Sequence, residues 1–165
     1  MNEFKAELQR LQPNITHPYK VMIAGTFDIV HTGHLQLIKT AAEIGDLYVI
    51  IARDNSVEKF KGQKPIMPEE QRMELIRNIK GVKHVELGSD KEEWLIRIVE
   101  IKPDLFLLGP NQWGNEASYE KETKQLGAQT LFRRLPNLDT KFPLNSSTKI
   151  KEKILKCYKA KPKKK

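Results

Sequence analysis

The sequence lacks the features that would point to secretion or to a membrane. Its 165 residues include a single cysteine, Cys157, which excludes a disulfide within the chain and a zinc site built from several cysteines. No apolar run reaches the ~18 residues that a membrane-spanning helix needs. The first residues, MNEFKAELQRLQPN, are charged where a signal peptide would be apolar. We therefore expect a cytoplasmic protein that is neither secreted nor embedded in a membrane.

The net charge of +8 is concentrated at the end of the chain. Residues 151–165 contain eight lysines and one glutamate, a charge of +7, which leaves +1 for residues 1–150. We interpret this basic end as a solvated tail, and nucleic acid is not the expected partner. Contact of the tail with RNA or with an anionic surface stays open, although Tyr158 is the only aromatic residue among its lysines.

Length and composition favour one folded domain. A chain of 165 residues has the size of one domain, and 39% apolar residues are enough to fill one core. We predict an N-terminal extension at residues 1–19, with room for a short helix laid on the domain. The domain itself is predicted at residues 20–155, and a Lys-rich tail at residues 156–165.

Apolar runs typical of strands alternate with segments of helical periodicity along most of the chain. Strands are predicted at residues 20–24, 47–52, 84–87, 105–108 and 129–132. Helices are predicted at residues 34–44, 68–79, 94–101 and 116–126, with a final helix that begins at Ser146 or Ser147, and residues 53–67 are predicted as a loop. Residues 47–52 and 105–108 are apolar throughout, which is typical of strands buried on both faces of a parallel sheet. The alternation predicts an α/β protein with a Rossmann-like, doubly wound parallel sheet in a single domain.

The loop after the first predicted strand, GTFDIVHTGH at residues 25–34, is the strongest candidate site. Ligands of doubly wound sheets bind at the carboxyl ends of the strands, where this loop leads into a helix. The positive end of that helix favours an anion, and Gly33 would let a phosphate approach the backbone. His31 and His34 can each donate a hydrogen bond to a phosphate oxygen. Two alternatives stay open: histidines that only cap the helix, and a zinc site with Asp28 as third ligand.

Several motifs resemble those of the cytidylyltransferase-like nucleotidyltransferases. GTFDIVHTGH is similar to the GTFD-x-x-H-x-G-H motif of that family, and the family landmarks PEEQRMELI, KPDLFLLG and SSTKI follow in family order. The resemblance covers about residues 20–155. The stretches ARDNSVEKFKGQKPIMPEEQR, LGSDKEEW and LGPNQW are most similar to the archaeal FAD synthases within this family. One departure is Asn111, which stands where the resemblance leads us to expect an acidic residue.

The resemblance implies nucleotidyl transfer from a nucleoside triphosphate to a phosphomonoester acceptor, with release of pyrophosphate. The expected substrates are ATP and FMN, which would give FAD. A phosphomonoester with a second pKa near ~6 needs no general base at neutral pH. Because Asp28 lacks carboxylate partners for a fixed site, Mg²⁺ is expected to arrive with the triphosphate. Alternatives are a cytidylyltransferase that uses CTP with glycerol 3-phosphate or another alcohol phosphate, and a non-catalytic nucleotide or RNA-binding module. The family also makes a homodimer possible.

The same resemblance, with the loop positions, assigns candidate roles to individual residues. The catalytic candidates stabilise the reacting phosphates: His31, His34 and Lys64. The nucleotide-binding candidates are Gly25, Thr26, Phe27, Gly33, Asn111, Ser147 and Thr148. The acceptor-binding candidates are Asp28, Lys61, Arg72 and Trp113. Simpler interpretations stay open, since loop lysines are often only solvated, Ser147 and Thr148 can cap a helix, and Trp113 can anchor a turn.

Overall fold

The computed structural model describes residues 3–89, 95–136 and 141–159 of the chain. Its helices are α1 (Glu3–Leu11), α2 (Thr32–Ile44), α3 (Asp54–Lys61), α4 (Glu69–Arg77), α5 (Ile96–Ile101), α6 (Glu116–Gln125) and α7 (Ser147–Lys159). Its strands are β1 (Lys20–Gly25), β2 (Asp46–Ile51), β3 (Val82–Leu87), β4 (Leu105–Leu108) and β5 (Leu131–Arg134). The predicted helix start at residue 94 and the last six residues of the predicted tail lie outside the described residues.

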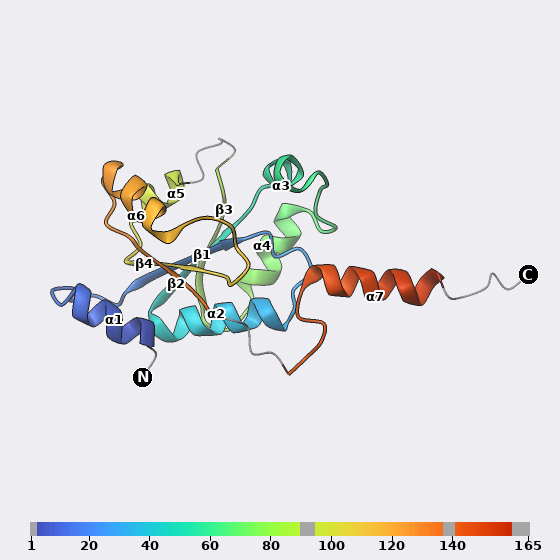
Figure 1. Ribbon diagram of the computed structural model, residues 1–165, viewed down its shortest axis with the longest axis horizontal. Helices are drawn as coiled ribbons and strands as arrows, with labels where there is room; N and C mark the ends of the chain where they lie inside the picture. Colours follow the sequence, from blue (N-terminus) through green and yellow to red (C-terminus); the bar gives the residue numbers. More distant parts are fainter. Residues whose placement is uncertain (1–2, 90–94, 137–140, 160–165) are drawn as a thin grey trace, which may run out of the picture.

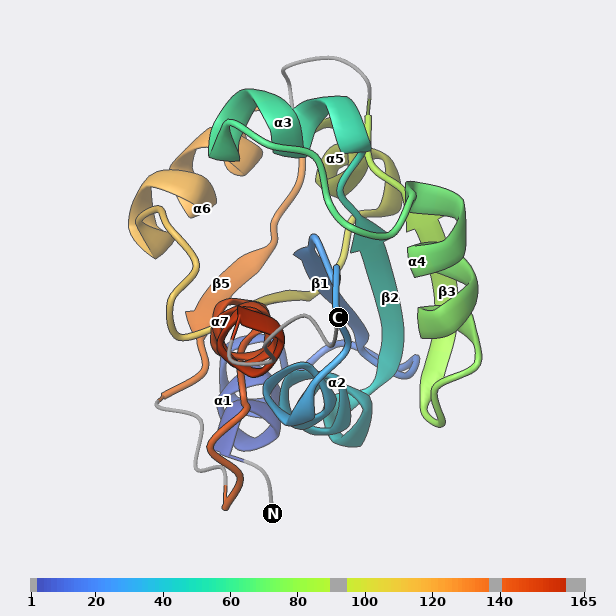
Figure 2. The same cartoon turned by 90° about the vertical axis from the view of Figure 1, so that its right-hand side faces the viewer.

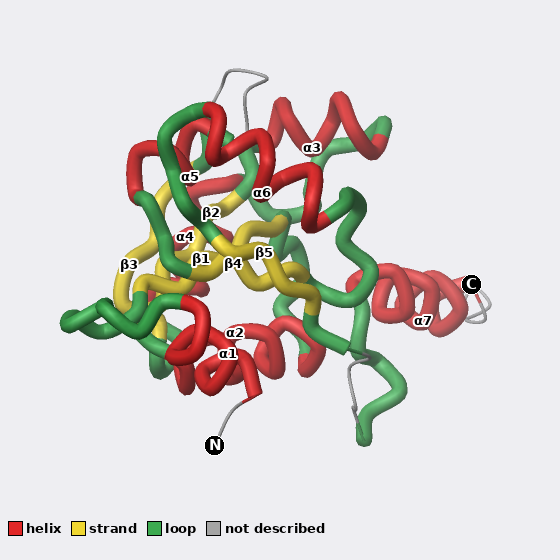
Figure 3. Tube along the Cα trace, turned by 60° about the vertical axis from the view of Figure 1, so that its left-hand side comes forward, coloured by secondary structure: helices red, strands yellow, loops and turns green. Residues whose placement is uncertain are grey.

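The five strands form one parallel sheet in the order β3-β2-β1-β4-β5. Helices α1 and α2 cover one face of the sheet, and α5 and α6 cover the other (Figures 1 and 3). The chain therefore winds in both directions from β1, and the strand order reverses between β1 and β4. This confirms the predicted doubly wound α/β fold and puts the ligand-binding position above the ends of β1 and β4.

The uniformly apolar strands are explained by two separate cores. Alternate residues of a strand point to opposite faces, so Val21 and Ile23 of β1 join one buried cluster while Met22 joins the other. The first cluster packs against α1, α2 and α4, and the second against α5 and α6. A strand buried on both faces has no polar face to show in its sequence.

Two elements differ from the sequence-based expectation. The predicted loop at residues 53–67 contains α3, which ends at Gly62 in a left-handed conformation with φ 72°. A tertiary contact supports this short helix, because the Asp54 and Glu69 carboxylates each accept a hydrogen bond from the other's backbone N–H. The last helix, α7, runs four residues beyond the predicted domain boundary at 155 and extends away from the sheet (Figure 1).

The predicted short helix in the N-terminal extension is present as α1. Phe4 and Leu8 of this helix are buried in the first core, and Glu7 forms an ion pair with Arg133 of β5 at 2.8 Å. In the described part of the chain, no helix combines the length and apolar character needed to cross a membrane.

Candidate active site

The loop from Gly25 to His31 leaves the carboxyl end of β1 at the centre of the sheet, which faces the viewer in Figure 2. Phe27 turns this loop with φ 51°, a left-handed conformation that is uncommon outside glycine. Its ring is 1% exposed and lies 3.0 Å from the place that a Cβ on Gly25 would occupy. Gly25 therefore leaves room for Phe27, and Phe27 is a core residue whose backbone alone could contact a nucleotide.

His31 and His34 come together at the N-terminus of α2. His31 is the N-cap residue, and its Nδ1 accepts a hydrogen bond from the His34 backbone N–H at 3.3 Å. The two rings stack with centroids 3.7 Å apart. Capping and phosphate binding are compatible here. Because Nδ1 of His31 is an acceptor, the neutral ring carries its proton on Nε2 and can donate it to a ligand.

Both histidines have lowered pKa values. Burial lowers the pKa of His31, and burial followed by the positive charges of His31 and Lys61 lowers the pKa of His34 to about 3. The pair is therefore neutral at pH 7 before a ligand binds. A bound triphosphate would add negative charge and raise both pKa values, which would strengthen the hydrogen bonds to its oxygens.

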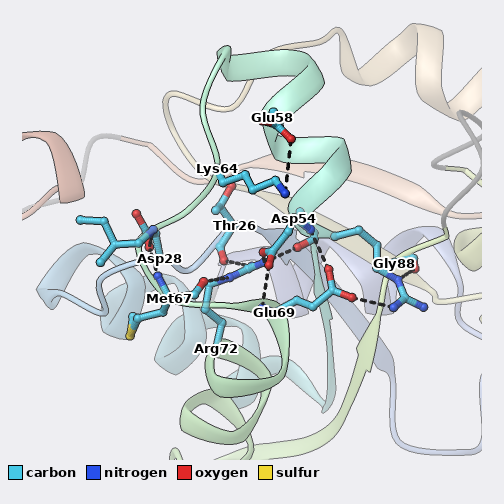
Figure 4. Close-up of polar contacts among 12 residues, drawn as sticks. Thr26, Asp28, Asp54, Glu58, Lys64, Met67, Glu69, Arg72 and Gly88 are labelled. Atoms are coloured by element: carbon cyan, nitrogen blue, oxygen red, sulfur yellow. Dashed lines mark hydrogen bonds and ion pairs between the residues drawn. The ribbon is translucent and has the colours of Figure 1, made fainter.

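Lys61, the last residue of α3, reaches the first loop. Its Nζ donates a hydrogen bond to Thr26 Oγ1 at 3.0 Å, and burial and the charge of Lys151 lower its pKa. Lys64 lies farther along and pairs only loosely with Glu58, at 3.8 Å (Figure 4). We predicted Lys64 as a catalytic residue and Lys61 as an acceptor-binding residue; of the two, Lys61 is the one with a described contact to the first loop.

Arg72 holds the loop instead of reaching outward. Its side chain is 0% exposed, and its guanidinium donates to the carbonyl oxygens of Thr26, Ala52 and Met67 and to Asp54 (Figure 4). These partners lie in the loops after β1 and β2 and before α4. The predicted contact between Arg72 and a substrate phosphate is therefore replaced by a positioning role, since the protein encloses the charge.

Asp28 is also a structural residue. Its carboxylate accepts hydrogen bonds from the backbone N–H groups of Ile66 at 2.7 Å and Met67 at 3.1 Å, and forms an ion pair with Lys151 at 2.7 Å. Burial alone would raise its pKa, but these three interactions lower it overall. We predicted that Asp28 binds the acceptor; with 5% exposure it instead ties two distant segments to the first loop.

Lys151 is one residue at this site that the sequence analysis missed. It lies in α7, more than 120 positions from its partner Asp28, and it follows directly after the SSTKI motif. In a lysine-rich segment no local pattern distinguishes it from its solvated neighbours. Its role is visible only in the structure, where it is paired with the buried carboxylate of Asp28.

The N-terminus of α7 contacts the first loop. Ser147 Oγ donates a hydrogen bond to the Ile29 carbonyl at 3.4 Å, and Ser146 Oγ accepts one from the Lys149 backbone N–H. Thr148 is exposed in the first turn of the helix. The free N–H groups of this turn can bind an anion, so capping and phosphate binding are again compatible.

The loop after β4 forms the opposite side of the site. Gln112 Nε2 donates a hydrogen bond to the Ala24 carbonyl at 3.3 Å. The Arg134 guanidinium donates hydrogen bonds to the carbonyls of Gln112 and Gly114. Asn111 and Trp113 on this loop are exposed. Their predicted contacts with the nucleotide and the acceptor stay predictions.

The described residues contain no group of three histidine, cysteine or acidic side chains that could hold a metal ion. The Asp28 carboxylate already has three partners. A zinc site at His31, His34 and Asp28 is therefore not supported by this donor set, and the residues present do not form a resident magnesium site.

A histidine pair and a helix N-terminus at the reversal point of a parallel sheet are typical of α/β proteins that bind phosphorylated nucleotides. Sequence comparison agrees. The cytidylyltransferase-like family profile matches residues 22–153, so the chain belongs to this family and is a nucleotidyltransferase.

Curated relatives from archaea carry the name FAD synthase. The protein from Pyrococcus horikoshii is 39% identical over 140 residues, which cover 84% of this chain and 94% of the relative. The one from Methanosarcina mazei is 40% identical, with 84% and 90% covered. The one from Korarchaeum cryptofilum is 34% identical, with 84% and 93% covered.

Solved structures support the fold. A protein from Thermoplasma volcanium, described as a lipopolysaccharide core biosynthesis protein, superposes with a TM-score of 0.69 and 32% identity, over 74% of this chain and 99% of that one. A protein of unknown function from Archaeoglobus fulgidus gives a TM-score of 0.61 at 16% identity, over 76% and 96%, and supports the fold alone.

Proposed function

We propose that this protein is an FMN adenylyltransferase, which joins ATP and FMN to give FAD and pyrophosphate. The observation that carries the proposal is the stacked His31 and His34 pair at the N-terminus of α2, in a chain similar to archaeal FAD synthases over most of its length. The FMN phosphate oxygen attacks the α-phosphorus of ATP, and the bond from that phosphorus to the bridging oxygen of the leaving pyrophosphate breaks.

The chain's contribution to this reaction is positioning and charge. The acceptor phosphate is already a nucleophile at neutral pH, so no side chain has to remove a proton. His31 and His34 donate hydrogen bonds to phosphate oxygens on which negative charge builds, and Lys61 supplies a positive charge from the other side of Thr26. The first turn of α7 binds the outer phosphates. Mg²⁺ enters with ATP, as part of the substrate.

The proposal is tested by pyrophosphate release with ATP, CTP, GTP or UTP and Mg²⁺. Each triphosphate is paired with FMN, glycerol 3-phosphate, phosphoethanolamine or a sugar phosphate, and a His34→Ala variant is run beside the wild type. Turnover with ATP and FMN that the variant loses supports both the substrates and the role of the histidines. Turnover with other substrates only would contradict FAD synthesis.

A cytidylyltransferase is the second candidate, because the family that the chain belongs to is described by that activity. Its acceptor would be glycerol 3-phosphate or another alcohol phosphate. Turnover with CTP and a small alcohol phosphate, without turnover of FMN, would establish this candidate.

We also propose a cytoplasmic enzyme, with a homodimer as the possible assembly and without nucleic acid as partner. Sedimentation at micromolar protein measures the assembly. Removal of residues 160–165 tests the nucleic-acid alternative, since turnover should persist, whereas an RNA-binding module would lose affinity and salt dependence.

A further inference from the structure

Two large aromatic side chains are exposed at the edge of the sheet that carries the site. Phe60, in the last turn of α3, is 73% exposed, and Trp113, in the loop between β4 and α6, is 67% exposed. Their ring centroids lie 5.9 Å apart with a tilt of 38° between the planes. Phe60 belongs to the segment after β2 and Trp113 to the segment after β4, so the two rings meet between elements and not within one element.

The neighbours of both rings contact the segment that leads to the histidines. Lys61, which follows Phe60, donates a hydrogen bond to Thr26 Oγ1. Gln112, which precedes Trp113, donates one to the Ala24 carbonyl. Ala24 and Thr26 flank Gly25 at the end of β1. The aromatic pair is therefore connected on both sides to the point where the phosphates bind.

The two sides of the pair are held differently. The backbone around Trp113 is fixed by Arg134, which bonds to the Gln112 and Gly114 carbonyls, and by the Tyr119 hydroxyl, which lies 3.4 Å from the Trp113 carbonyl. Phe60 is followed after one residue by Gly62, where α3 ends. Trp113 thus has a backbone held by other elements, and the exposed side chain of Phe60 at the end of α3 is the side with room to move.

We propose that Phe60 and Trp113 bind the flat ring of the acceptor, a proposal that rests on the FMN adenylyltransferase function above. Two stacking contacts need about 7–8 Å between the outer rings, so Phe60 has to move outward by about 1–2 Å from its present contact with Trp113. A tricyclic isoalloxazine offers enough area to cover both rings. An acceptor such as glycerol 3-phosphate has no group to stack, so the pair selects a large flat acceptor over a small alcohol phosphate.

The test compares Phe60→Ala, Trp113→Ala and Trp113→Phe with the wild type. Tyr158→Ala is the matched control, because Tyr158 is also 73% exposed but lies on α7. Quenching of flavin fluorescence gives the Kd for FMN, and pyrophosphate release gives the KM for FMN and for ATP separately. We expect the Kd and KM for FMN to rise at least about fivefold in both alanine variants, the usual effect of losing one stacked ring. The KM for ATP should stay constant, and Trp113→Phe should keep most of the affinity.

The outcomes separate this proposal from the proposed function. Wild-type protein that neither binds FMN nor makes FAD overturns both. The aromatic site alone is overturned if the wild type makes FAD and both alanine variants have the same Kd for FMN as the Tyr158→Ala control. A rise in the KM for ATP in place of that for FMN also overturns it, because the pair would then hold the adenine base.

Discussion

The inner loop and the outer rim of the site are built in opposite ways. The inner loop, residues 25–31, is held by Arg72 and Asp28, which are 0% and 5% exposed and bonded only to the protein. The outer rim, which we define as Phe60, Lys64 and Trp113, is exposed; Phe60 contacts Trp113, and Lys64 pairs with Glu58 at 3.8 Å. The inner loop is therefore held by enclosed charges, whereas the rim is open to solvent. The following predictions test this difference, beginning with the largest expected effect.

Replacement of Arg72 should damage the inner loop most. Arg72→Met removes the donor to three carbonyl groups and the charged partner of Asp54, which keeps its hydrogen bond from the Glu69 backbone N–H; loss of one partner in a buried network costs about 3–5 kcal/mol. Urea unfolding monitored by circular dichroism measures this change in unfolding free energy. The surface variant Arg77→Met is the control and should change it by less than about 0.5 kcal/mol. An equal, small effect of both would contradict the positioning role.

Replacement of His34 should act on the reaction more than on the fold. Removal of one hydrogen-bond donor to the developing charge lowers kcat about 100- to 1,000-fold. Pyrophosphate release measures kcat, and urea unfolding checks that His34→Ala is still folded. A variant that keeps wild-type kcat would remove the histidine pair from the mechanism.

The contact between Lys151 and Asp28 should make an intermediate contribution to stability. Lys151→Met removes a charged hydrogen bond from a buried carboxylate, which costs about 1–3 kcal/mol. Lys153→Met, on the same helix but exposed, is the control. The double variant with Lys151→Met and Asp28→Asn should lose less stability than the sum of the losses in the two single variants, because both changes remove the same interaction. Strict additivity would show that the ion pair contributes nothing.

The neutral histidine pair should make stability depend on pH. The unfolded chain protonates its histidines near pH 6.5, whereas folded His34 stays neutral down to a pKa of about 3. Protons therefore favour the unfolded state, and stability should fall as the pH drops from 7 to 5. Thermal unfolding across this range measures the slope, which should be smaller in His34→Gln. If stability depends on pH equally in the wild type and in His34→Gln, groups other than His34 cause the dependence.

The smallest effect is expected at Lys64 on the rim. Its ion pair with Glu58 is exposed and 3.8 Å long, and such pairs contribute about 0–1 kcal/mol. Lys64→Ala should leave the KM values within about twofold, whereas Lys61→Ala should raise the KM of a phosphorylated substrate by more, since Lys61 reaches Thr26. A larger effect of Lys64→Ala would restore the original assignment.

The sequence by itself determined the chain order of strands and helices and the position of the histidine loop. These features are local: apolar runs specify buried strands, and His31 and His34 lie three residues apart at the start of one helix. The short helix α3 escaped prediction because its support comes from Asp54 and Glu69, which contact each other across fifteen positions.

Only the tertiary structure decided which charged side chains are enclosed by the protein. Arg72 and Asp28 look like exposed site residues in sequence, yet they are buried by partners from distant segments, among them Ala52 and Lys151. The choice of Lys61 over Lys64, and the meeting of Phe60 with Trp113, likewise depend on where α3 lies. The physical reason is that residue type and spacing encode local backbone structure, whereas burial and ion pairing depend on which distant segments the fold brings together.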